Sequence, residues 1–498
     1  MPALRSRQNR PNILLIMTDQ HRADMMSCAG SSQVPTPNID RIAARGVRFA
    51  HAYCPYPVCV ASRMSMLTGL YSHTTGAVNN SDRLDWRYRT LAHHFADHGY
   101  LTGLIGKMHF GDAHKHGFAY YLSINDWLMA LGPKARHYAN EIANHPLGEN
   151  FYRTVDDDGA GLPDVSGIWG TPGPWVGHVE RWDFKSMASN LEAEDHLDAF
   201  IARETAKFMR QYRDQPFFLI ASFMKPHTPL FAPREWAERY PVDKAVLPDP
   251  GPVASYPEHI RKRIAGFLKR DEWLRKAHFA GYCGNLAFAD VCVGQTLDAL
   301  EELDLADNTI VVYTSDHGEM HGDHGLFQKF CLFEPSVRVP LIAAWRGHIA
   351  EGTVAEALTE QIGLYPTLCE LAGFGQPRHT AVAGWMEPDS GFGAPASLDA
   401  RSFAEIVLDP ALPGPDAAFS EFALRSGVCS YMVRTKLWKY IHNDGGELDE
   451  LYDCQGDPGE YRNLAIDPAR AGIVNEMRER LLGWFDPARN RFKPRREG

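Results

Sequence analysis

The sequence predicts an α/β protein with a large, mostly parallel sheet covered by helices on both faces, followed by a smaller α+β domain. Short unbroken apolar runs at 12–17, 101–105 and 308–313 are typical of parallel strands that are buried on both faces. Amphipathic segments of helical length, such as 197–213, separate these runs. Strands and helices therefore alternate along the chain, which is the order that a parallel sheet requires.

The length and composition fit a large globular domain joined to a smaller one. The chain has 498 residues, of which 44% are hydrophobic and 23% are charged, and this length exceeds what one core usually supports. Glycine, proline and serine are enriched around 376–400, which marks a connection. We expect an α/β domain over 11–375 and an α+β domain over 400–498, with a small antiparallel sheet and a helix.

Charge and cysteine content exclude several classes of protein. The formal net charge of −11 argues against a nucleic-acid-binding surface. Nine scattered cysteines, an odd number, do not form the pattern of a disulfide framework. The apolar run at 13–17 is too short for a signal peptide, and no stretch is long enough to cross a bilayer. We therefore expect a cytoplasmic protein without a membrane or nucleic-acid partner.

Capping residues and periodicity predict the remaining elements. Thr36 and Pro37 are typical of a helix start, and Gly46 of the end of that helix. Further helices are predicted at 90–98, 272–303 and 473–485, and further strands at 47–53, 216–223, 430–435 and 437–442.

Residues 145–190 are rich in Gly, Pro, Asp and Trp and lack clear periodicity. We interpret them as a long ordered insertion. Its Trp169, Trp175 and Trp182 either form a wall of a substrate pocket, because long loops in compact domains are often functional, or pin the loop to the core. The sequence leaves both roles open.

Cys59 stands where a reactive side chain is expected. It follows a proline-flanked loop and precedes a short predicted helix. The free N–H groups of a first helical turn attract anions and favour an anionic nucleophile. Arg63 lies four residues on, and so shares a helix face with Cys59. The pair suits an anion with several oxygens, although a lone cysteine is about as often a buried structural residue.

Polar side chains follow two of the predicted strands. Asp19 and Gln20 come after the first apolar run, and Asp316 and His317 come after the run at 308–313. Ligands of open α/β sheets bind beyond the carboxyl ends of the strands. If the two strands are neighbours, these side chains can form a site for a divalent cation.

A competing interpretation makes His317, His321 and His324 a zinc cluster. Their spacing allows it, but Gly318 and Gly322 argue against a helix that would hold the three rings together.

Lys107, His109 and His227 also follow predicted strands. If the backbone stays extended after 101–105, Lys107 and His109 point to the same side. His227 lies beyond the strand at 216–223. Taken singly, a solvated lysine and satisfied structural histidines are the more ordinary interpretations.

Several segments together resemble the formylglycine-dependent sulfatases of the alkaline phosphatase superfamily. The similarity extends in family order from Pro11 to about Ala465. The segments that carry it are Cys59 to Arg63 (C-V-A-S-R) with Leu67-Thr68-Gly69, the pair Lys107 and His109, Thr314 to Glu319 (T-S-D-H-G-E), Gly325 to Lys329 with Ser336 to Pro340, and Asp457 to Leu464 (D-P-G-E-Y-R-N-L).

The resemblance implies an alkaline-phosphatase-like fold and a sulfuric ester hydrolase that acts on a small sulfate ester. A separate formylglycine-generating enzyme would convert Cys59 to formylglycine. One divalent metal would be held by the residues that match the family's ligands: Asp19, Gln20, Cys59, Asp316 and His317.

The same resemblance implies roles for the other site residues. Arg63, Lys107 and Lys329 would neutralise the sulfuryl oxygens. His227 would protonate the departing alcohol, and His109 would help to release sulfate from formylglycine. The protein could form a homo-oligomer.

Some positions depart from the common pattern of the family. Ala61 stands where proline is commoner, and Gln20 and His317 replace the carboxylate and amide of many calcium sulfatases. Calcium is the first expectation, with manganese or magnesium as alternatives because one ligand is a nitrogen. The Gln/His pair also resembles the choline-sulfatase and phosphonate-monoester-hydrolase branches.

Two alternatives to a sulfatase remain. One is a phosphonate monoester or phosphodiester hydrolase on the same scaffold. The other is a non-catalytic, anion-binding relative in which Cys59 stays a thiol.

Overall fold

The computed structural model describes residues 10–110, 114–135, 138, 187–375, 377, 380–382, 397–423 and 428–485. Most of the predicted insertion, with Trp169, Trp175 and Trp182, and most of the predicted connection at 376–400 lie outside these residues.

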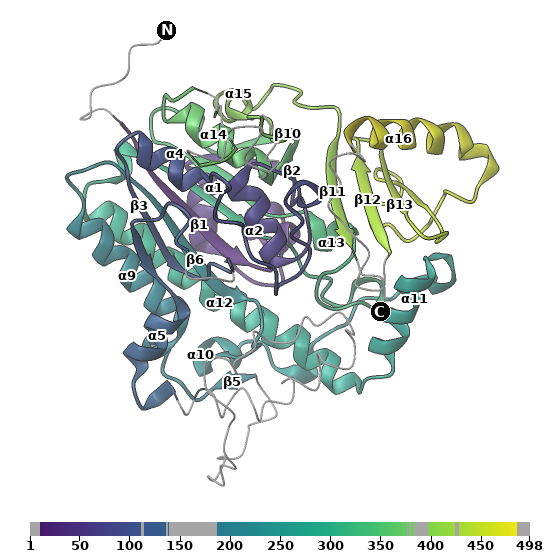
Figure 1. Cartoon of the computed structure of the whole chain (residues 1–498). Helices are drawn as coiled ribbons and strands as arrows, with labels where there is room; N and C mark the ends of the chain where they lie inside the picture. The colour runs from purple at the N-terminus through teal and green to yellow at the C-terminus, as the bar shows by residue number, and fades with distance from the viewer. Residues whose placement is uncertain are drawn as a thin grey trace.

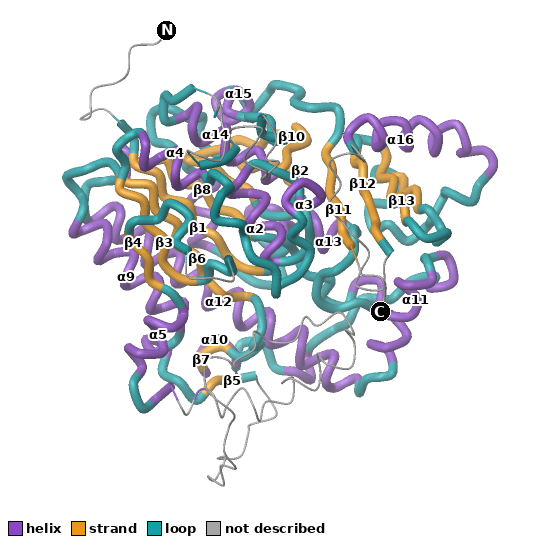
Figure 2. The backbone as a smooth tube through the Cα atoms, viewed as in Figure 1, coloured by secondary structure: helices purple, strands orange, loops and turns teal. Residues whose placement is uncertain are grey.

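A large mixed sheet forms the centre of the molecule (Figure 2). Its neighbouring strands pair in parallel, except that β9 is antiparallel to both β2 and β8. The expectation of a mostly parallel sheet is thus confirmed. In spatial order the strands are β10 (Thr353–Glu360), β2 (Gly46–Tyr53), β9 (Leu341–Ala344), β8 (Thr309–Ser315), β1 (Asn12–Asp19), β6 (Phe217–Pro226), β3 (Leu101–Gly106) and β4 (Tyr120–Leu122).

Helices cover both faces of this sheet. Their bounds are α1 (Pro37–Ala44), α2 (Cys59–Thr68), α3 (Ser72–Thr75), α4 (Leu91–Asp97), α5 (Ile124–Leu131), α9 (Leu197–Gln211), α10 (Arg234–Ala237), α11 (Glu258–Leu268), α12 (Glu272–Glu302), α13 (Glu334–Val337), α14 (Leu364–Leu371) and α15 (Ala404–Leu408). A short pair of strands, β5 (Ala188–Ser189) and β7 (Ala232–Pro233), lies beside α10.

Alternate side chains of β1 enter two different cores. Ile13 and Leu15 pack in the core that includes apolar residues of α2, α4 and α14. Leu14 and Ile16 pack in the core formed with α1, α9 and the second half of α12. Successive strand side chains point to opposite faces, so a strand between two helical layers must be apolar at every position. This is the physical reason for the unbroken apolar run that predicted the strand.

A second, antiparallel sheet follows in the chain (Figure 1). It contains β11 (Ala418–Ala423), β12 (Cys429–Arg434), β13 (Trp438–Asn443) and β14 (Glu450–Asp453) in sequential order. Helix α16 (Ala471–Trp484) packs on β12 and β13, and its Met477 and Leu481 enter a small core with Val433. The expected α+β part is present, while the domain boundaries at 375 and 400 stay a prediction.

Element ends differ from the predictions where neighbouring strands extend the pairing. Strand β6 continues to Pro226, because Asp19 pairs with Pro226 after an irregularity in β1. Strand β8 continues to Ser315 opposite Thr18. Gly46 was expected to end the first helix, but α1 ends at Ala44 and Gly46 is the first residue of β2.

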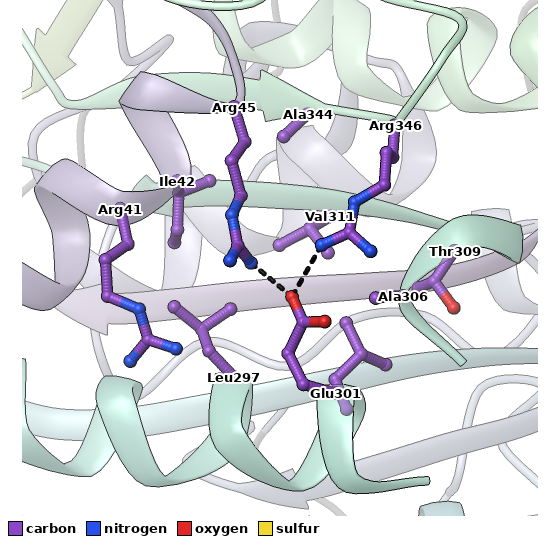
Figure 3. A pocket seen from close by; sticks show the side chains of 11 residues that line it. Arg41, Ile42, Arg45, Leu297, Glu301, Ala306, Thr309, Val311, Ala344 and Arg346 are labelled. Atoms are coloured by element: carbon purple, nitrogen blue, oxygen red, sulfur yellow. Dashed lines mark hydrogen bonds and ion pairs between the residues drawn. The ribbon is translucent and has the colours of Figure 1, made fainter. Parts of the chain in front are cut away.

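A surface pocket lies at the amino end of β8 (Figure 3). Arg45 and Arg346 both form ion pairs with Glu301 there, and Arg346 also pairs with Asp307. The pocket is at the opposite end of the strand from the polar residues that follow Ser315, and so is separate from the candidate site.

No helix among the described residues is both long enough and apolar enough to span a bilayer.

Glu360 joins the two sheets. It ends β10, and its Oε1 accepts hydrogen bonds from the Tyr71 hydroxyl at 2.7 Å and from the Phe419 N–H of β11 at 2.9 Å. Burial raises the pKa of Glu360 from 4.5 to about 7. A raised folded-state pKa means that the folded protein holds this proton more tightly than the unfolded chain does.

Stability contributed by Glu360 is therefore full below about pH 4.5 and is lost as the pH rises through about 7. The unfolding free energy of Glu360→Gln minus that of the wild type should therefore increase by on the order of 1–3 kcal/mol as the pH rises from about 5 to about 8. Urea unfolding across this range measures the difference. Glu356→Gln, at an exposed position of the same strand, is the control. Parallel pH profiles for Glu360→Gln and wild type would contradict the assignment.

Candidate active site

The candidate site lies beyond the carboxyl ends of β1 and β8. These strands are parallel neighbours with Thr18 opposite Ser315, so the residues that follow each strand emerge side by side. Asp19 is the last residue of β1, and Asp316 comes directly after β8. The first residue of α2, Cys59, faces them. The sequence prediction that the two strand ends meet is confirmed.

Four side chains converge at this edge of the sheet. Ligand atoms of Asp19, Cys59, Asp316 and His317 all lie within 4.8 Å of one another, and all four residues are buried. The Cys59 Sγ lies 3.1 Å from His317 Nε2 and 3.8 Å from Asp19 Oδ1. Two carboxylates, a ring nitrogen and a sulfur thus surround one point.

Hydrogen bonding defines the tautomer of His317. Its Nδ1 lies 2.9 Å from the Gly318 carbonyl, which can only accept, so Nδ1 carries the proton. The lone pair of the neutral ring is then on Nε2, on the side of Cys59 and Asp316. This arrangement is the one that metal-binding histidines use.

Arg63 connects the two carboxylates. Its NH2 lies 3.0 Å from Asp19 and its Nε 2.8 Å from Asp316, while NH1 donates to the Lys107 carbonyl and to Ser222 Oγ, each at 2.8 Å. A fully buried guanidinium in this position fixes three loops at once.

The two carboxyl groups have opposite electrostatic environments. Burial and the nearby Cys59 would raise the pKa of Asp19, but Lys107, His227 and Arg63 hold it well below its ordinary value. Burial and the negative charge of Asp19 raise the pKa of Asp316. Two buried carboxylates this close favour a cation between them.

Lys107 reaches Asp19 because β3 ends in a glycine. Gly106 has φ +107°, and a Cβ there would lie 2.1 Å from the Ser222 carbonyl oxygen, so only glycine fits. Lys107 Nζ then lies 2.5 Å from Asp19 Oδ2. The condition that the backbone stays extended after this strand is not met, since Gly106 and His109 both have positive φ. Both side chains nevertheless lie close enough to Cys59 to interact with it electrostatically.

Lys329 also approaches Cys59. Its Nζ is 2.7 Å from Gln20 Oε1, 3.1 Å from His227 Nε2 and 3.6 Å from Cys59 Sγ. Gln20 thus directs its carboxamide oxygen to the site, while its Nε2 donates to the Glu319 carboxylate.

His227 is held in one orientation. Its Nδ1 lies 2.7 Å from the Thr228 carbonyl, so Nδ1 donates and Nε2 faces Lys329 and, at 3.8 Å, Asp19 Oδ1. Burial, together with the cations Lys107 and Lys329, lowers the pKa of His227 to about 4.

The surrounding cations act on Cys59. Burial alone would raise the pKa of its thiol, but Lys107 and Lys329, together with His317 when its ring is protonated, hold it well below its ordinary value. Negative charge at this position is therefore stabilised, as the position at the start of α2 also favours.

The competing zinc cluster does not form among the described residues. His321 stacks on Phe279 with ring centroids 3.9 Å apart, and His324 stacks on Phe333 at 4.1 Å and bonds Tyr256 through Nδ1. Only His317 of the three enters a group of potential metal ligands.

Several residues of the site had no predicted role. Ser62 Oγ donates to the Asp316 carbonyl at 2.5 Å, and Ser222 Oγ donates to the Lys107 carbonyl at 2.6 Å. Glu319 receives the Gln20 amide and the backbone N–H of His321. The sequence signal that could have indicated a role for Ser222 is that it is a polar residue inside the apolar strand β6.

Comparison with known proteins agrees with this geometry. The sequence profile described as Sulfatase matches residues 11–374. The chain belongs to the sulfatase family. This sulfatase is 28% identical to an arylsulfatase of Clostridium perfringens over 96% of each chain. It is also 28% identical to a choline-sulfatase of Rhizobium meliloti, over 92% of this chain and 83% of that protein.

The fold of the sulfatase is also shared with solved structures. The phosphonate monoester hydrolase of Agrobacterium radiobacter superposes with a TM-score of 0.74 at 24% identity, covering 95% of each chain. The alkaline-phosphatase-like fold predicted from the sequence is therefore confirmed.

The donor set of the sulfatase fits a divalent cation. Two carboxylates and a ring nitrogen with an available lone pair meet at one buried point. A cation there would also relieve the repulsion that raises the pKa of Asp316. The Gln20 oxygen accepts a hydrogen bond from Lys329, and its role as a metal ligand stays a prediction.

Each carboxylate should be needed for metal binding. Asp19→Asn and Asp316→Asn keep the size of the side chain but remove an anionic ligand, so metal affinity should fall by more than the 10–100-fold, roughly, that outer-shell changes cost. Calorimetric titration of metal-free protein and elemental analysis measure it. Asp298→Asn, on the exposed part of α12 where it pairs with Arg41, is the matched control. Full occupancy in either site variant would show that the site is elsewhere.

Proposed function

We propose that this sulfatase hydrolyses a small sulfate monoester to an alcohol and inorganic sulfate, with Cys59 converted to formylglycine as the nucleophile. The observation that carries the proposal is that Cys59 lies among the metal-ligand side chains and next to Lys329, with Lys107 also close enough to lower the pKa of its thiol. A nucleophile next to a cation site and flanked by lysines suits attack on an anionic ester.

The conversion of Cys59 oxidises its Cβ to an aldehyde and removes the sulfur, so it needs an oxidant and a separate maturation enzyme. Hydrated formylglycine would supply one hydroxyl that attacks sulfur and a second whose deprotonation releases sulfate, and a bound metal would make the first hydroxyl a better nucleophile. Asp19, Asp316 and His317, with Gln20, would hold that metal. Calcium is the first candidate, and manganese or magnesium are the alternatives because His317 offers nitrogen.

The lysines bind the ester. Lys107 and Lys329 both lie near Cys59 and would neutralise the non-bridging oxygens as charge moves toward the leaving group. The resemblance implied the same role for Arg63. Since Arg63 is bonded to Asp19, Asp316 and the Lys107 carbonyl, we assign it the role of holding these groups in place.

The histidines move protons. His227 Nε2 lies next to Lys329, so a leaving oxygen close to this pair would be protonated by His227 once Nε2 has itself taken up a proton. Burial and neighbouring cations lower the pKa of His227, and the negative charge of a bound ester offsets the cations. We assign His109, which interacts electrostatically with Cys59, the role of accepting a proton from the second hydroxyl.

The second candidate is a phosphonate monoester or phosphodiester hydrolase, which the structural neighbour from Agrobacterium radiobacter favours. Lys107 and His109 favour the sulfate ester. They face Cys59 together and suit an ester with three non-bridging oxygens.

Cys59 should be found as formylglycine in protein made together with a maturation enzyme. Peptide mass spectrometry should show the loss of SH and hydrogen and the gain of oxygen at this residue. Cys59→Ala should abolish turnover and keep the fold. Cys54→Ala, at another buried cysteine five residues earlier, should keep activity. Fully active protein that contains only the thiol would refute the mechanism.

Sulfate monoesters should be preferred to phosphorus esters. A phosphonate or phosphodiester replaces one oxygen by carbon or alkoxy, which would leave donors of Lys107 and His109 unpaired at about 1–3 kcal/mol each. Each 1.36 kcal/mol corresponds to about tenfold in rate, so kcat/KM should favour aryl sulfate by some orders of magnitude.

Rates with aryl sulfate, aryl phosphonate and bis-aryl phosphate on one preparation decide between the two functions. His109→Asn should reduce the preference. A faster phosphorus substrate would replace the sulfatase proposal by the second candidate.

A further inference from the structure

The segment that follows β6 is bound by one side chain of α12. Asn285 Nδ2 lies 3.3, 3.2 and 3.0 Å from the carbonyl oxygens of Pro226, His227 and Pro229. Its Oδ1 accepts from Lys225 Nζ at 2.8 Å. A single carboxamide therefore binds three backbone carbonyls of the segment that carries His227.

The partners determine the orientation of this amide. Carbonyl oxygens only accept and an ammonium only donates, so Nδ2 and Oδ1 of Asn285 cannot be exchanged without losing all of these bonds. Asn285 is fully buried and Lys225 nearly so. Removing such a donor leaves buried carbonyls unsatisfied, which is costly.

Glycine brings the helix close enough for these bonds. A Cβ at Gly281 would lie 2.4 Å from the Leu230 carbonyl oxygen, so the 225–231 segment packs directly on the backbone of α12. Gly281 and Asn285 are one helical turn apart and therefore present the same face to this segment.

The position of the His227 ring depends on this backbone. The His227 N–H donates to the Asp19 carbonyl at 3.1 Å, and Nδ1 donates to the Thr228 carbonyl at 2.7 Å. Only then does Nε2 lie 3.1 Å from Lys329 Nζ. Displacement of a proton-transfer group by about 1 Å can reduce a rate by about 100-fold.

We propose that Asn285 is a positioning residue that sets the place of the His227 imidazole relative to the leaving group, an inference that rests on the proposed function. Asn285 touches neither the metal-ligand side chains nor Cys59 in any recorded contact of the described residues, and it acts through the backbone of Pro226 to Pro229.

Asn285→Asp tests the inference, since it keeps the size of the side chain and the acceptor for Lys225 but removes the donors. A poor leaving group needs a proton more than a good one. The variant should lose about tenfold or more in kcat/KM for phenyl sulfate, and clearly less for 4-nitrophenyl sulfate. A purely structural role would reduce both rates equally.

A double-variant cycle gives the second readout. If Asn285 acts through His227, Asn285→Asp combined with His227→Ala should be no slower on phenyl sulfate than His227→Ala alone. Independent, multiplying losses would overturn the proposal. Asn463→Asp is the matched control, because Asn463 is a buried asparagine of the small domain that also donates to backbone carbonyls. It should leave the leaving-group dependence unchanged.

The experiments distinguish failure of the proposed function from failure of the inference about Asn285. If wild-type protein containing formylglycine cleaves no aryl sulfate, the proposed function fails. The crystal structure of Asn285→Asp then still decides the inference, since an unmoved His227 ring would overturn it and a displaced ring would support it. If Asn285→Asp does not fold, Asn285→Ser replaces it with the same readouts.

Discussion

The buried guanidinium of Arg63 is the interaction on which the site depends. It carries the only positive charge placed between Asp19 and Asp316 among the described contacts, and it also reaches the Lys107 carbonyl. Three strand ends are thereby tied to the first helix after the Cys59 loop. Burying two carboxylates without such a partner would be strongly unfavourable, so Arg63 makes the assembled site compatible with a stable fold.

Strand pairing in the sheet brings the main residues of the site together, and the loop conformations orient the remaining side chains. Parallel pairing of β1 with β8 brings Asp19 to Asp316 with no special loop conformation. Gln20, His109 and Gln328, in contrast, have positive φ. Strained conformations of this kind persist where surrounding contacts fix them. Here those contacts include the hydrogen bonds of Glu319 to Gln20 and Gln328.

The sequence predicted the strands well because a strand between two helical layers must be apolar throughout, as in β1 and β8. It also predicted that Asp19 and Asp316 would meet, since carboxyl ends of adjacent parallel strands share an edge. Backbone direction after Gly106 was not predictable in this way. Gly106 allows a turn, and the alternation of side chains along a strand does not describe the residues after it. The backbone from Lys107 to His109 is therefore not extended.

Roles of polar residues inside buried elements were the hardest to predict. Ser222 and Asn285 lie within apolar runs, and their roles depend on partners that are distant in the sequence. Ser222 accepts from Arg63, and Asn285 donates to the segment after β6. Long-range pairing of this kind leaves no periodic signal in the chain. The sequence shows only that a polar residue stands where an apolar one is expected, which marks the position but does not identify its partner.

The complete burial of Cys59 sets the order of events in biogenesis. Its side chain has 0% exposure, enclosed by residues as far apart in the chain as Asp19 and Lys329. An enzyme cannot bind the polypeptide around a side chain that is buried in this way. Any enzymatic conversion of Cys59 must therefore precede the closing of the sheet. If Cys59 is converted as proposed, folding and conversion compete for the same chain, and a molecule that folds first keeps the unmodified cysteine for as long as it stays folded.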